Sequence, residues 1–334
     1  MTDKKVSIII LNYNGWKDTI ECLTSIYQVN YSPYDIILVD NASEDESLAK
    51  IRQFGNEGLG SHHAIEFQEY DGGEYLKKPE RTSPGRAGGK NDKFRLILLK
   101  NDKNYGFAEG NNIAIRFALH HLKPDYLLFL NNDTVVDQKF IGILVEQGEQ
   151  DDGIGILGPT VYDYNDPNRI SVFGGFINLY TGVTSYPRRD ELDTGQLPPT
   201  SKMDYISGCC LLIKRGVLED IGMFNAHYFL YYEDTELCFR ARSRGYKVVH
   251  VAMSQVWHKV SPLGISSTGI FYLTRNRFWF LRTYSPYFQF VSFLIFFFLF
   301  LFLFHAIRYL IHGNLKGLRS FYAGIKTGLL SPAI

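Results

Sequence analysis

The sequence predicts an α/β fold built on a doubly wound, mostly parallel, Rossmann-like sheet. Short, continuously apolar runs alternate with segments whose apolar residues recur at helical spacing, which is the order of elements in such a fold. Residues 6–11 form a continuous run, so we expect this strand to be buried on both faces, as strands of parallel sheets are, and residues 35–39 to form a second buried strand. The four expected strands are residues 6–11, 35–39, 94–99 and 126–130.

The first two strands and the helix between them form the clearest βαβ unit. Residues 6–11 are rich in Ile, and the helix that follows is expected from the spacing of Trp16, Ile20, Leu23 and Ile26. Ser43, with Glu46 three residues later, fits a capping box, which predicts that a second helix starts after the second strand. A third helix is expected around Ile113, before the fourth strand.

Residues 55–93 interrupt this alternation. They contain eight glycines and a polar string at residues 77–86, so we expect an inserted flexible loop or a small hairpin. Residues 1–265, which include this insertion, are expected to form one catalytic domain. Residues 266–334 are expected to form a basic and hydrophobic helical region that associates with a membrane.

Charge is unevenly distributed along the chain. The formal net charge is 0, with 35 basic and 35 acidic residues, but no Asp or Glu follows Glu236, whereas twelve Lys and Arg do. In the same third, residues 290–304 are apolar except for Ser292 and consist mainly of Phe and Leu. A basic segment with such a run fits a membrane surface better than a nucleic acid, so we expect a membrane partner and no nucleic acid.

The mode of membrane association is open from the sequence. Residues 287–311 reach the roughly 20 apolar residues that a span requires, although Gln289, His305 and Arg308 are polar. Both flanks are basic, so charge gives no orientation. We expect a monotopic or re-entrant segment rather than a single clean span. A buried core helix is the remaining alternative, which so many adjacent Phe residues disfavour because they leave no polar face.

The cysteines and the N-terminus indicate a reducing compartment. Neither disulfide nor zinc-ligand spacing relates the four cysteines, which are Cys22, Cys209, Cys210 and Cys238. The apolar run at residues 6–11 is too short for the core of a signal peptide. We therefore expect a peripheral protein at the cytoplasmic face of a membrane.

Polar residues follow every expected strand. In open α/β sheets, ligands bind at the carboxyl ends of the strands. Taken singly, each of these residues is an ordinary turn or capping residue; together, four polar strand ends predict a ligand site. The residues are Asn12 and Asn14, then Asp40 and Asn41, then Asn104, Gly106 and Phe107, and finally Asn131, Asn132 and Asp133.

At five places the sequence resembles the family 2 glycosyltransferases of GT-A fold, and within them the rhamnosyltransferase-like branch. The matching strings are residues 7–14, 39–43, 104–112, 130–133 and 232–240, followed by Arg275-Asn276-Arg277. Their order and spacing also match, over nearly the whole chain. The resemblance implies transfer of a sugar, with dTDP-rhamnose favoured and UDP-sugars as the alternative donors. The implied acceptor is a glycan or a lipid-linked glycan of cell-surface polysaccharide synthesis.

The resemblance also implies a donor site with a divalent ion. Asp40 would accept the imide N3–H of uracil or thymine, which a carboxylate does well. Asp133 would bind Mg2+ or Mn2+, because hard cations prefer carboxylate and diphosphate oxygens, and His258 would add a contact unless it is merely structural. Asn131 stands where the commoner Asp-x-Asp form has its first acid. The implied donor-binding residues are Asn12, Asn14, Asp40, Asn41, Asn104, Gly106, Phe107, Gly110, Asn111, Asn131 and Asn132.

Glu233 and Asp234 are the implied catalytic residues. Both precede a helix, where acids also complement the helix dipole without any catalytic role. The resemblance makes Asp234 the general base and Glu233 a neighbour that binds acceptor hydroxyls. Ser207 and Gly208 would lie beside the acceptor. One base without a nucleophile implies inversion at the anomeric carbon.

Two other classes of protein explain less of the sequence. A dehydrogenase or methyltransferase would share the sheet, but no Gly-x-Gly-x-x-Gly turn follows the first strand. A non-catalytic membrane adaptor that binds nucleotide sugars would explain the C-terminal third but not the acids at residues 233–234.

Overall fold

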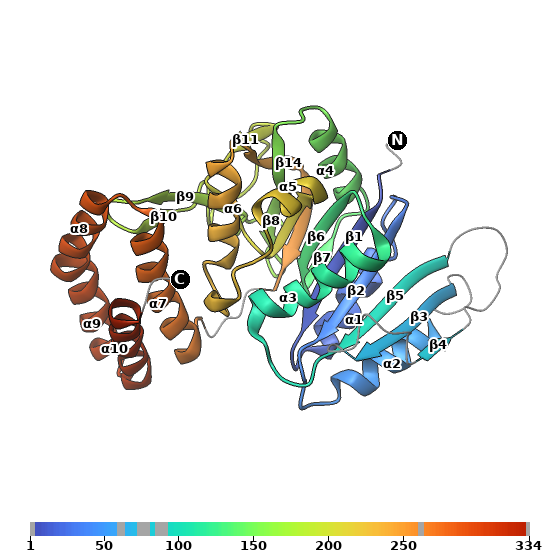
Figure 1. The fold of residues 1–334 in the computed structure, drawn as a ribbon, viewed down its shortest axis with the longest axis horizontal. Helices are drawn as coiled ribbons and strands as arrows, with labels where there is room; N and C mark the ends of the chain where they lie inside the picture. The colour runs from blue at the N-terminus through green and yellow to red at the C-terminus, as the bar shows by residue number, and fades with distance from the viewer. Residues whose placement is uncertain (1–3, 59–63, 72–80, 84–92, 260–263, 332–334) are drawn as a thin grey trace.

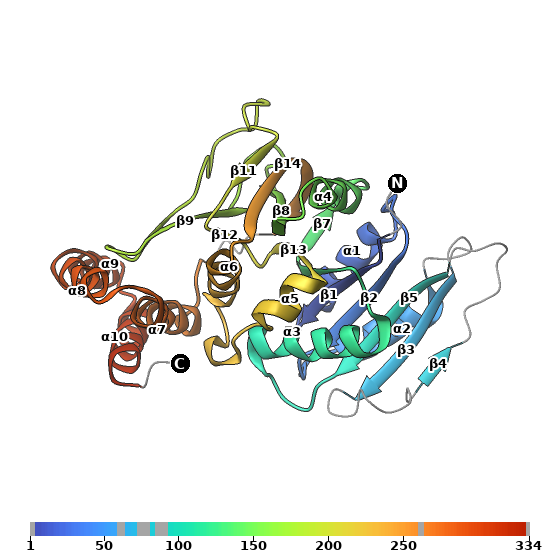
Figure 2. The ribbon, with the colours of Figure 1, turned by 45° about the horizontal axis from the view of Figure 1, so that its top comes forward.

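The computed structural model describes residues 4–58, 64–71, 81–83, 93–259 and 264–331. Its main sheet has the strand order β11-β14-β8-β13-β6-β1-β2-β5-β3-β4, with β7 paired to β14. Helices cover both faces, with α3 and α5 on one side of the sheet and α1 and α2 on the other (Figure 2). The predicted fold class, a mostly parallel α/β sheet with a C-terminal helical region, is confirmed.

The parallel half of the sheet contains the four predicted strands. These are β1 (Val6–Asn12), β2 (Tyr34–Asp40), β5 (Lys93–Lys100) and β6 (Tyr126–Asn131). Every residue of β2 is buried, as its continuous apolar run predicts. Asn12 lies opposite Asp40 across β1 and β2, so the polar residues that end these strands meet at one edge.

The other half of the sheet is mixed. β13 (Cys210–Lys214) runs antiparallel between β6 and β8 (Ile154–Asp163), and β14 (Lys247–His258) runs parallel to β8. Two short strands, β7 (Thr134–Val136) and β11 (Thr200–Lys202), pair antiparallel with β14. The β7 pairing sets His258 opposite Thr134, the residue after Asp133. A smaller sheet consists of β10 (Val183–Ser185), β9 (Gly174–Asn178) and β12 (Tyr205–Ile206).

The helices that precede residue 265 follow the predicted alternation. They are α1 (Trp16–Ile26), α2 (Ser47–Glu57), α3 (Gly106–Phe117) with a π-helical extension (Ala118–Leu122), α4 (Phe140–Glu149), α5 (Arg215–Ile221), a 3-10 turn (Ala226–Tyr228) and α6 (Glu233–Ser243). The first turn of α6 carries the two acids predicted to be catalytic.

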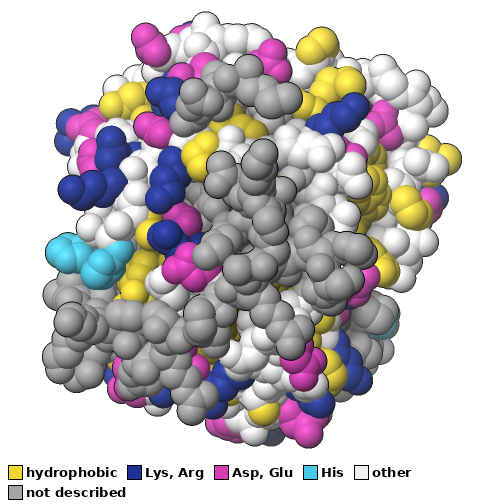
Figure 3. All heavy atoms as spheres, turned by 90° about the vertical axis from the view of Figure 1, so that its right-hand side faces the viewer, with side chains coloured by type: hydrophobic (Ala, Val, Ile, Leu, Met, Phe, Trp, Pro, Cys, Tyr) yellow, Lys and Arg dark blue, Asp and Glu magenta, His cyan; other side chains and the backbone are white. Residues whose placement is uncertain are grey.

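Residues 55–93 contain a strand that the sequence reading missed. β3 (Ala64–Asp71) runs parallel to β5 in the main sheet, and β4 (Arg81–Ser83) pairs antiparallel with β3. Of the two expectations for this segment, the small hairpin is confirmed by the antiparallel pairing of β3 and β4, whereas the flexible loop is wrong for these residues. Residues 59–63, 72–80 and 84–92 of the segment lie outside the described residues. On the face of the molecule toward this end, basic and acidic side chains are interspersed (Figure 3), in contrast to the acid-free C-terminal third.

The C-terminal helices form a group with its own apolar core at the opposite end of the molecule (Figure 1). They are α7 (Ser267–Tyr284), α8 (Tyr287–Phe296), a π-helical segment (Phe297–Leu301), α9 (Phe302–Ile311) and α10 (Leu315–Leu330). Phe278, Phe293 and Phe297 are buried at the centre of this core. Tyr228 and Tyr232, from the loop before α6, belong to the same cluster.

Residues Tyr287–Ile311 form one continuous helical stretch of 25 residues with mean hydropathy 2.7, long and apolar enough to cross a membrane. Within its most apolar window only 11% of residues are buried in the protein, so the alternative of a buried core helix is wrong. The exposed side chains include Phe288, Phe298, Leu299, Phe300, Leu303 and Phe304. The stretch fits membrane association.

Two phenylalanines of the π-helical segment should differ sharply in their contribution to stability. Phe297 is fully buried against Phe278 and Phe293, whereas Phe300 is 58% exposed. Replacing a buried Phe by Ala costs about 3–5 kcal/mol, so Phe297→Ala should clearly lower the melting temperature of the detergent-solubilised chain. Phe300→Ala is the matched control and should leave it nearly unchanged. Equal shifts for the two variants would contradict the packing described here.

Candidate functional site

Asp40 ties the ends of β1 and β2 together. It is fully buried; its Oδ1 accepts hydrogen bonds from Asn12 Nδ2 (2.7 Å) and Ser43 Oγ (2.6 Å), and its Oδ2 accepts one from the Ser43 backbone N–H (3.0 Å). The predicted capping box is therefore wrong, because Ser43 binds Asp40 and α2 begins at Ser47 without a side-chain cap. The contact between Asp40 and the donor base stays a prediction.

Asn41 fixes the loop that leads into α3. Its Nδ2 donates to Asn104 Oδ1 (2.9 Å) and to the Gly106 carbonyl (3.1 Å), and its Oδ1 accepts from the Tyr105 backbone N–H (3.1 Å). Gly106 has φ +76°, and a Cβ there would lie 2.5 Å from the Phe229 ring. The conformation and the close approach both require glycine.

Other predicted donor residues also hold the frame of the site. A Cβ on Gly110 would lie 2.7 Å from Leu11 Cδ1, so glycine lets α3 approach β1. Three further asparagine side chains bind within the chain: Asn14 Oδ1 accepts from the Glu44 backbone N–H (2.8 Å), Asn111 Nδ2 donates to the Phe107 carbonyl (2.8 Å), and Asn132 Nδ2 donates to Thr19 Oγ1 (3.0 Å). These amides give the strand ends a fixed shape.

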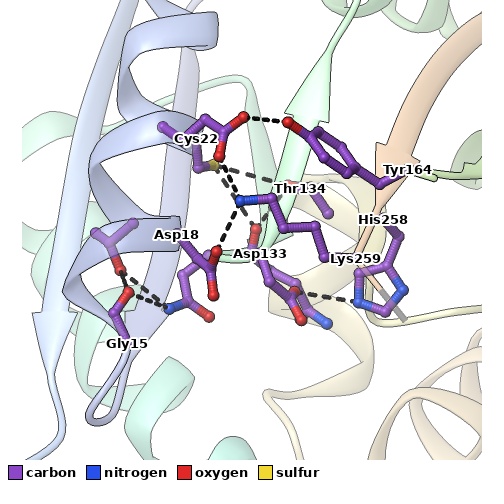
Figure 4. A network of polar contacts seen from close by, with 12 residues as sticks. Gly15, Asp18, Cys22, Asp133, Thr134, Tyr164, His258 and Lys259 are labelled. Carbon is purple, nitrogen blue, oxygen red and sulfur yellow. Dashed lines mark hydrogen bonds and ion pairs between the residues drawn. The ribbon is translucent and has the colours of Figure 1, made fainter. Parts of the chain in front are cut away.

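Asp133 and His258 face each other at the β7 and β14 edge (Figure 4). His258 Nε2 lies 3.1 Å from Asp133 Oδ1, a buried oxygen that makes no hydrogen bond in the described structure. Lys259, the next residue, has its ammonium held by Asp18 (2.7 Å) and Glu21. The Lys259 charge is thus paired with these two carboxylates, while its backbone N–H donates to the Asp133 carbonyl (3.0 Å).

The pair of Asp133 and His258 fits a divalent ion that also binds a substrate. No group of three or more His, Cys, Asp or Glu side chains suited to a metal occurs in the described part of the chain. Two protein ligands are nevertheless enough for Mg2+ or Mn2+ when phosphate oxygens complete the coordination. Asp133 Oδ1 and His258 Nε2, which lie 3.1 Å apart, are the atoms that such an ion would bind.

Asp234 lies against the backbone of the predicted acceptor segment. Its Oδ2 accepts from the Gly208 N–H (2.8 Å) and its Oδ1 from the Thr235 N–H (2.6 Å). A Cβ on Gly208 would lie 3.3 Å from the Phe107 ring. Burial raises the pKa of Asp234 above its ordinary value, although these hydrogen bonds act in the opposite direction. Desolvation of this kind makes a carboxylate a stronger proton acceptor.

Residues 208 and 209 adjoin both Asp234 and the pair of Asp133 and His258. The Asn131 backbone N–H donates to the Cys209 carbonyl (2.9 Å) at the end of β6. Burial raises the pKa of the Cys209 thiol well above its ordinary value, and the nearby charge of Asp133 adds to this. Ser207 Oγ accepts from the Cys209 N–H (3.3 Å). Asp234 thus bonds to Gly208, and Asp133 lies near enough to the next residue, Cys209, to affect its pKa.

Glu233 is a buried carboxylate without a partner for one of its oxygens. It is 5% exposed, and its Oε2 makes no hydrogen bond in the described structure. Burial and, second, the charge of Asp234 raise the pKa of Glu233 well above its ordinary value. Complementing the helix dipole does not require such burial. Buried, unsatisfied and shifted acids are typical of functional sites.

The loop before α6 holds an unusual backbone that sequence reasoning missed. Phe229, Tyr231 and Tyr232 have φ values of 63°, 66° and 72°. Asn276 of α7, which is fully buried, donates through Nδ2 to the carbonyls of Tyr228 (2.9 Å), Leu230 (2.8 Å) and Tyr231 (2.7 Å). The only sequence signal was the polar triplet Arg275-Asn276-Arg277 in the helix that follows.

The comparisons with known proteins agree with this geometry. Residues 88–277 match a family model described as "Glycosyltransferase like family 2", and residues 7–91 match "Glycosyl transferase family 2". The mannosyltransferase PcManGT from Pyrobaculum calidifontis, solved with GDP-Man and Mn2+, has a TM-score of 0.56 at 15% identity over 100% of this chain and 77% of its own. GalNAc-T7, solved with UDP, GalNAc and Mn2+, also has a TM-score of 0.56 at 15% identity, over 81% and 47%.

The fold and the site thus define a glycosyltransferase of GT-A fold. The chain belongs to the family 2 glycosyltransferases, since one family model alone covers more than half of it. The hexosyltransferase Agl10 of low-salt glycan biosynthesis in Haloferax volcanii is 25% identical over 82% of this chain and 74% of its own. An N-acetylglucosaminyl-diphospho-decaprenol L-rhamnosyltransferase of Mycobacterium tuberculosis is 27% identical over 49% and 58%. The dTDP-rhamnosyl transferase RfbF of Shigella flexneri is 25% identical over 57% and 64%.

Replacing Glu233 by Gln should stabilise the protein in a pH-dependent way. Because the folded-state pKa of Glu233 is raised, ionising it costs stability above its unfolded pKa, and the cost grows as the pH rises toward the folded pKa. The melting temperature of Glu233→Gln should therefore exceed that of the wild type by more at about pH 8 than at about pH 5. Glu236→Gln, which breaks a buried ion pair with Arg240 (2.8 Å), is the control and should be destabilising. A pH-independent difference for Glu233→Gln would contradict the shifted pKa.

Replacing Asn276 by Leu should impair catalysis more than donor binding. Leu has a similar shape but no donors, so the loop before the acids loses all three of its hydrogen bonds to Asn276. Turnover should fall about tenfold or more, which corresponds to about 1.4 kcal/mol. Phe297→Ala destabilises the same helical core without touching the loop and is the matched control. If the control lowers turnover equally, Asn276 acts only through stability.

Proposed function

We propose that this family 2 glycosyltransferase transfers a sugar with inversion from a nucleotide-sugar donor to a lipid-linked or other glycan acceptor. The favoured donor is dTDP-rhamnose, in keeping with two relatives that are named rhamnosyltransferases, and UDP-sugars are the alternative. The observation that carries the proposal is Asp234, held by Gly208 next to the segment that adjoins Asp133.

The donor would bind at the carboxyl ends of β1, β2, β5 and β6. Asp40 and the asparagines around it form a rigid frame in which the nucleoside is recognised. Asp133 and His258 would hold Mg2+ or Mn2+; two structural neighbours were solved with Mn2+. When bound, the ion would neutralise the charge of the departing diphosphate.

Asp234 would act as the general base. The acceptor oxygen bonds to the anomeric carbon as the bond from that carbon to the diphosphate breaks, and the hydroxyl proton passes to Asp234. The raised pKa of Asp234 brings its basicity closer to that needed near neutral pH. Glu233, beside it, would bind a second acceptor hydroxyl through its unpartnered oxygen.

The helices after residue 265 would dock the enzyme on the cytoplasmic leaflet. The exposed apolar side of α8 and α9 would enter the hydrocarbon, and basic residues of the acid-free third would face anionic lipid. We therefore treat residues 1–265 as the catalytic domain and residues 266–334 as the membrane-associating region. Asn276 joins the two through its bonds to the loop before α6.

The metal proposal predicts that Asp133→Asn collapses metal-stimulated activity. Purified protein would be assayed for donor hydrolysis and transfer with Mg2+, with Mn2+ and in EDTA. Wild-type activity should require a divalent ion, and Asp133→Asn should lose most of it because the amide is a poor ligand for a hard cation. Asp152→Asn, at an exposed position, is the control and should behave as wild type. Full activity of Asp133→Asn in EDTA would reject the metal role.

The general-base proposal predicts that Asp234→Asn lowers turnover by about 10² or more, the usual effect of positioned proton transfer. Donor affinity, measured by calorimetry, should change little. Wild-type turnover should rise with pH as Asp234 loses its proton, at a pH above the ordinary Asp value because the pKa is raised. This rise should be absent in the variant. If donor affinity falls in parallel with turnover, Asp234 is a binding residue instead.

A further inference from the structure

A pocket of about 400 Å³ lies between α7, α9 and α10, away from the strand ends that would bind the donor. Its polar side chains are mainly basic or neutral donors: Arg277, His305, Arg308, His312 and Asn314. No carboxylate lines it within the described residues, and the sequence has no acid after Glu236. The pocket therefore attracts anions.

The two guanidinium groups lack acidic partners. Among the described contacts, Arg277 bonds only to the Tyr232 hydroxyl, through Nε (3.3 Å), and no hydrogen bond or ion pair involves Arg308. Arginine binds phosphate oxygens bidentately and so supplies both charge and geometry for such a group. Two unpaired arginines in one concave site fit a phosphate or diphosphate.

The pocket also has an apolar lining, from Ile265, Ile270, Leu273 and Phe321, and Ile265 is exposed. The helices that form the pocket carry further exposed apolar side chains, Ile307 and Ile311 on α9 and Leu315 on α10. A free nucleotide has no long apolar group that would contact these apolar side chains. A phosphate group joined to a long apolar chain matches both the polar pocket and its surroundings.

Arg277 also links the pocket to the acids. The Tyr232 hydroxyl that it contacts belongs to the residue directly before Glu233 and Asp234. A head group bound at Arg277 would thus lie beside the loop that presents the acids.

We propose that this pocket binds the phosphate or diphosphate of the lipid-linked acceptor and presents the acceptor sugar toward Asp234. The inference rests on the proposed glycosyltransferase function and adds the acceptor's chemical class: an apolar chain joined through phosphate to the sugar that is extended. Ordinary anionic phospholipid and free diphosphate share part of this chemistry, so the test separates them.

The test measures binding of farnesyl diphosphate to the full chain in neutral detergent. Wild type should bind it at least tenfold more tightly than farnesol or inorganic diphosphate, because it alone satisfies both parts of the site. Arg308→Gln should weaken binding at least tenfold. Arg277→Gln should do the same as a second variant. Arg319→Gln, at an exposed position of α10 outside the pocket, is the matched control and should bind as wild type.

Four outcomes would overturn the inference: no binding by wild type, equal weakening by Arg319→Gln, equal affinity for inorganic diphosphate, or equally effective competition by phosphatidylglycerol. Metal-dependent donor hydrolysis, which needs no acceptor, is measured in the same samples. If the donor is hydrolysed but farnesyl diphosphate does not bind, the pocket proposal is wrong and the transferase proposal is unaffected. If wild type does not hydrolyse the donor, the proposed function itself is wrong.

Discussion

The buried amide of Asn276 holds the backbone on which the proposed chemistry depends. Left-handed conformations at three non-glycine residues cost of the order of 1–3 kcal/mol each, and they persist only where the surroundings enforce them. Asn276 supplies that constraint by bonding to three carbonyls of the loop. Because Asn276 lies on α7, the geometry of Glu233 and Asp234 depends on the same helices that carry the apolar surface. The C-terminal helices and the loop before α6 are therefore coupled through Asn276.

The asparagine and the acidic side chains near the strand ends differ in their interactions. The asparagines after β1, β2 and β5 use their side chains to fix loops, so the site is rigid before any ligand binds. Glu233 and Asp234 instead have raised pKa values, and Asp133 faces His258 at 3.1 Å. Burial of the ionised Glu233 lowers the stability of the fold, and functional sites often reduce stability in this way.

The features that could be predicted from the sequence are those that depend on short stretches of it, such as single strands and helices. Apolar runs identified the parallel strands, and the polar residues after them meet at one edge of the sheet, where the ligand site stays a prediction. β3 was missed because its charged residues read as loop, although Glu69 is buried in an ion pair with Arg52 (2.6 Å) that no local pattern reveals. Ser43 has the spacing of a capping box, but its hydroxyl donates to Asp40, three residues upstream, and does not cap α2. The role of Asn276 was invisible because its acceptors lie more than forty residues away.

The central claim is that one carboxylate, Asp234, removes the acceptor proton while the donor is attacked directly. Such a mechanism forms no glycosyl-enzyme intermediate, so the configuration of the anomeric carbon must invert once. The most direct test is the anomeric configuration of the product, determined by NMR, when the purified chain uses a nucleotide sugar of defined configuration. The account predicts the opposite configuration in the product. Retention of the donor's configuration would contradict it.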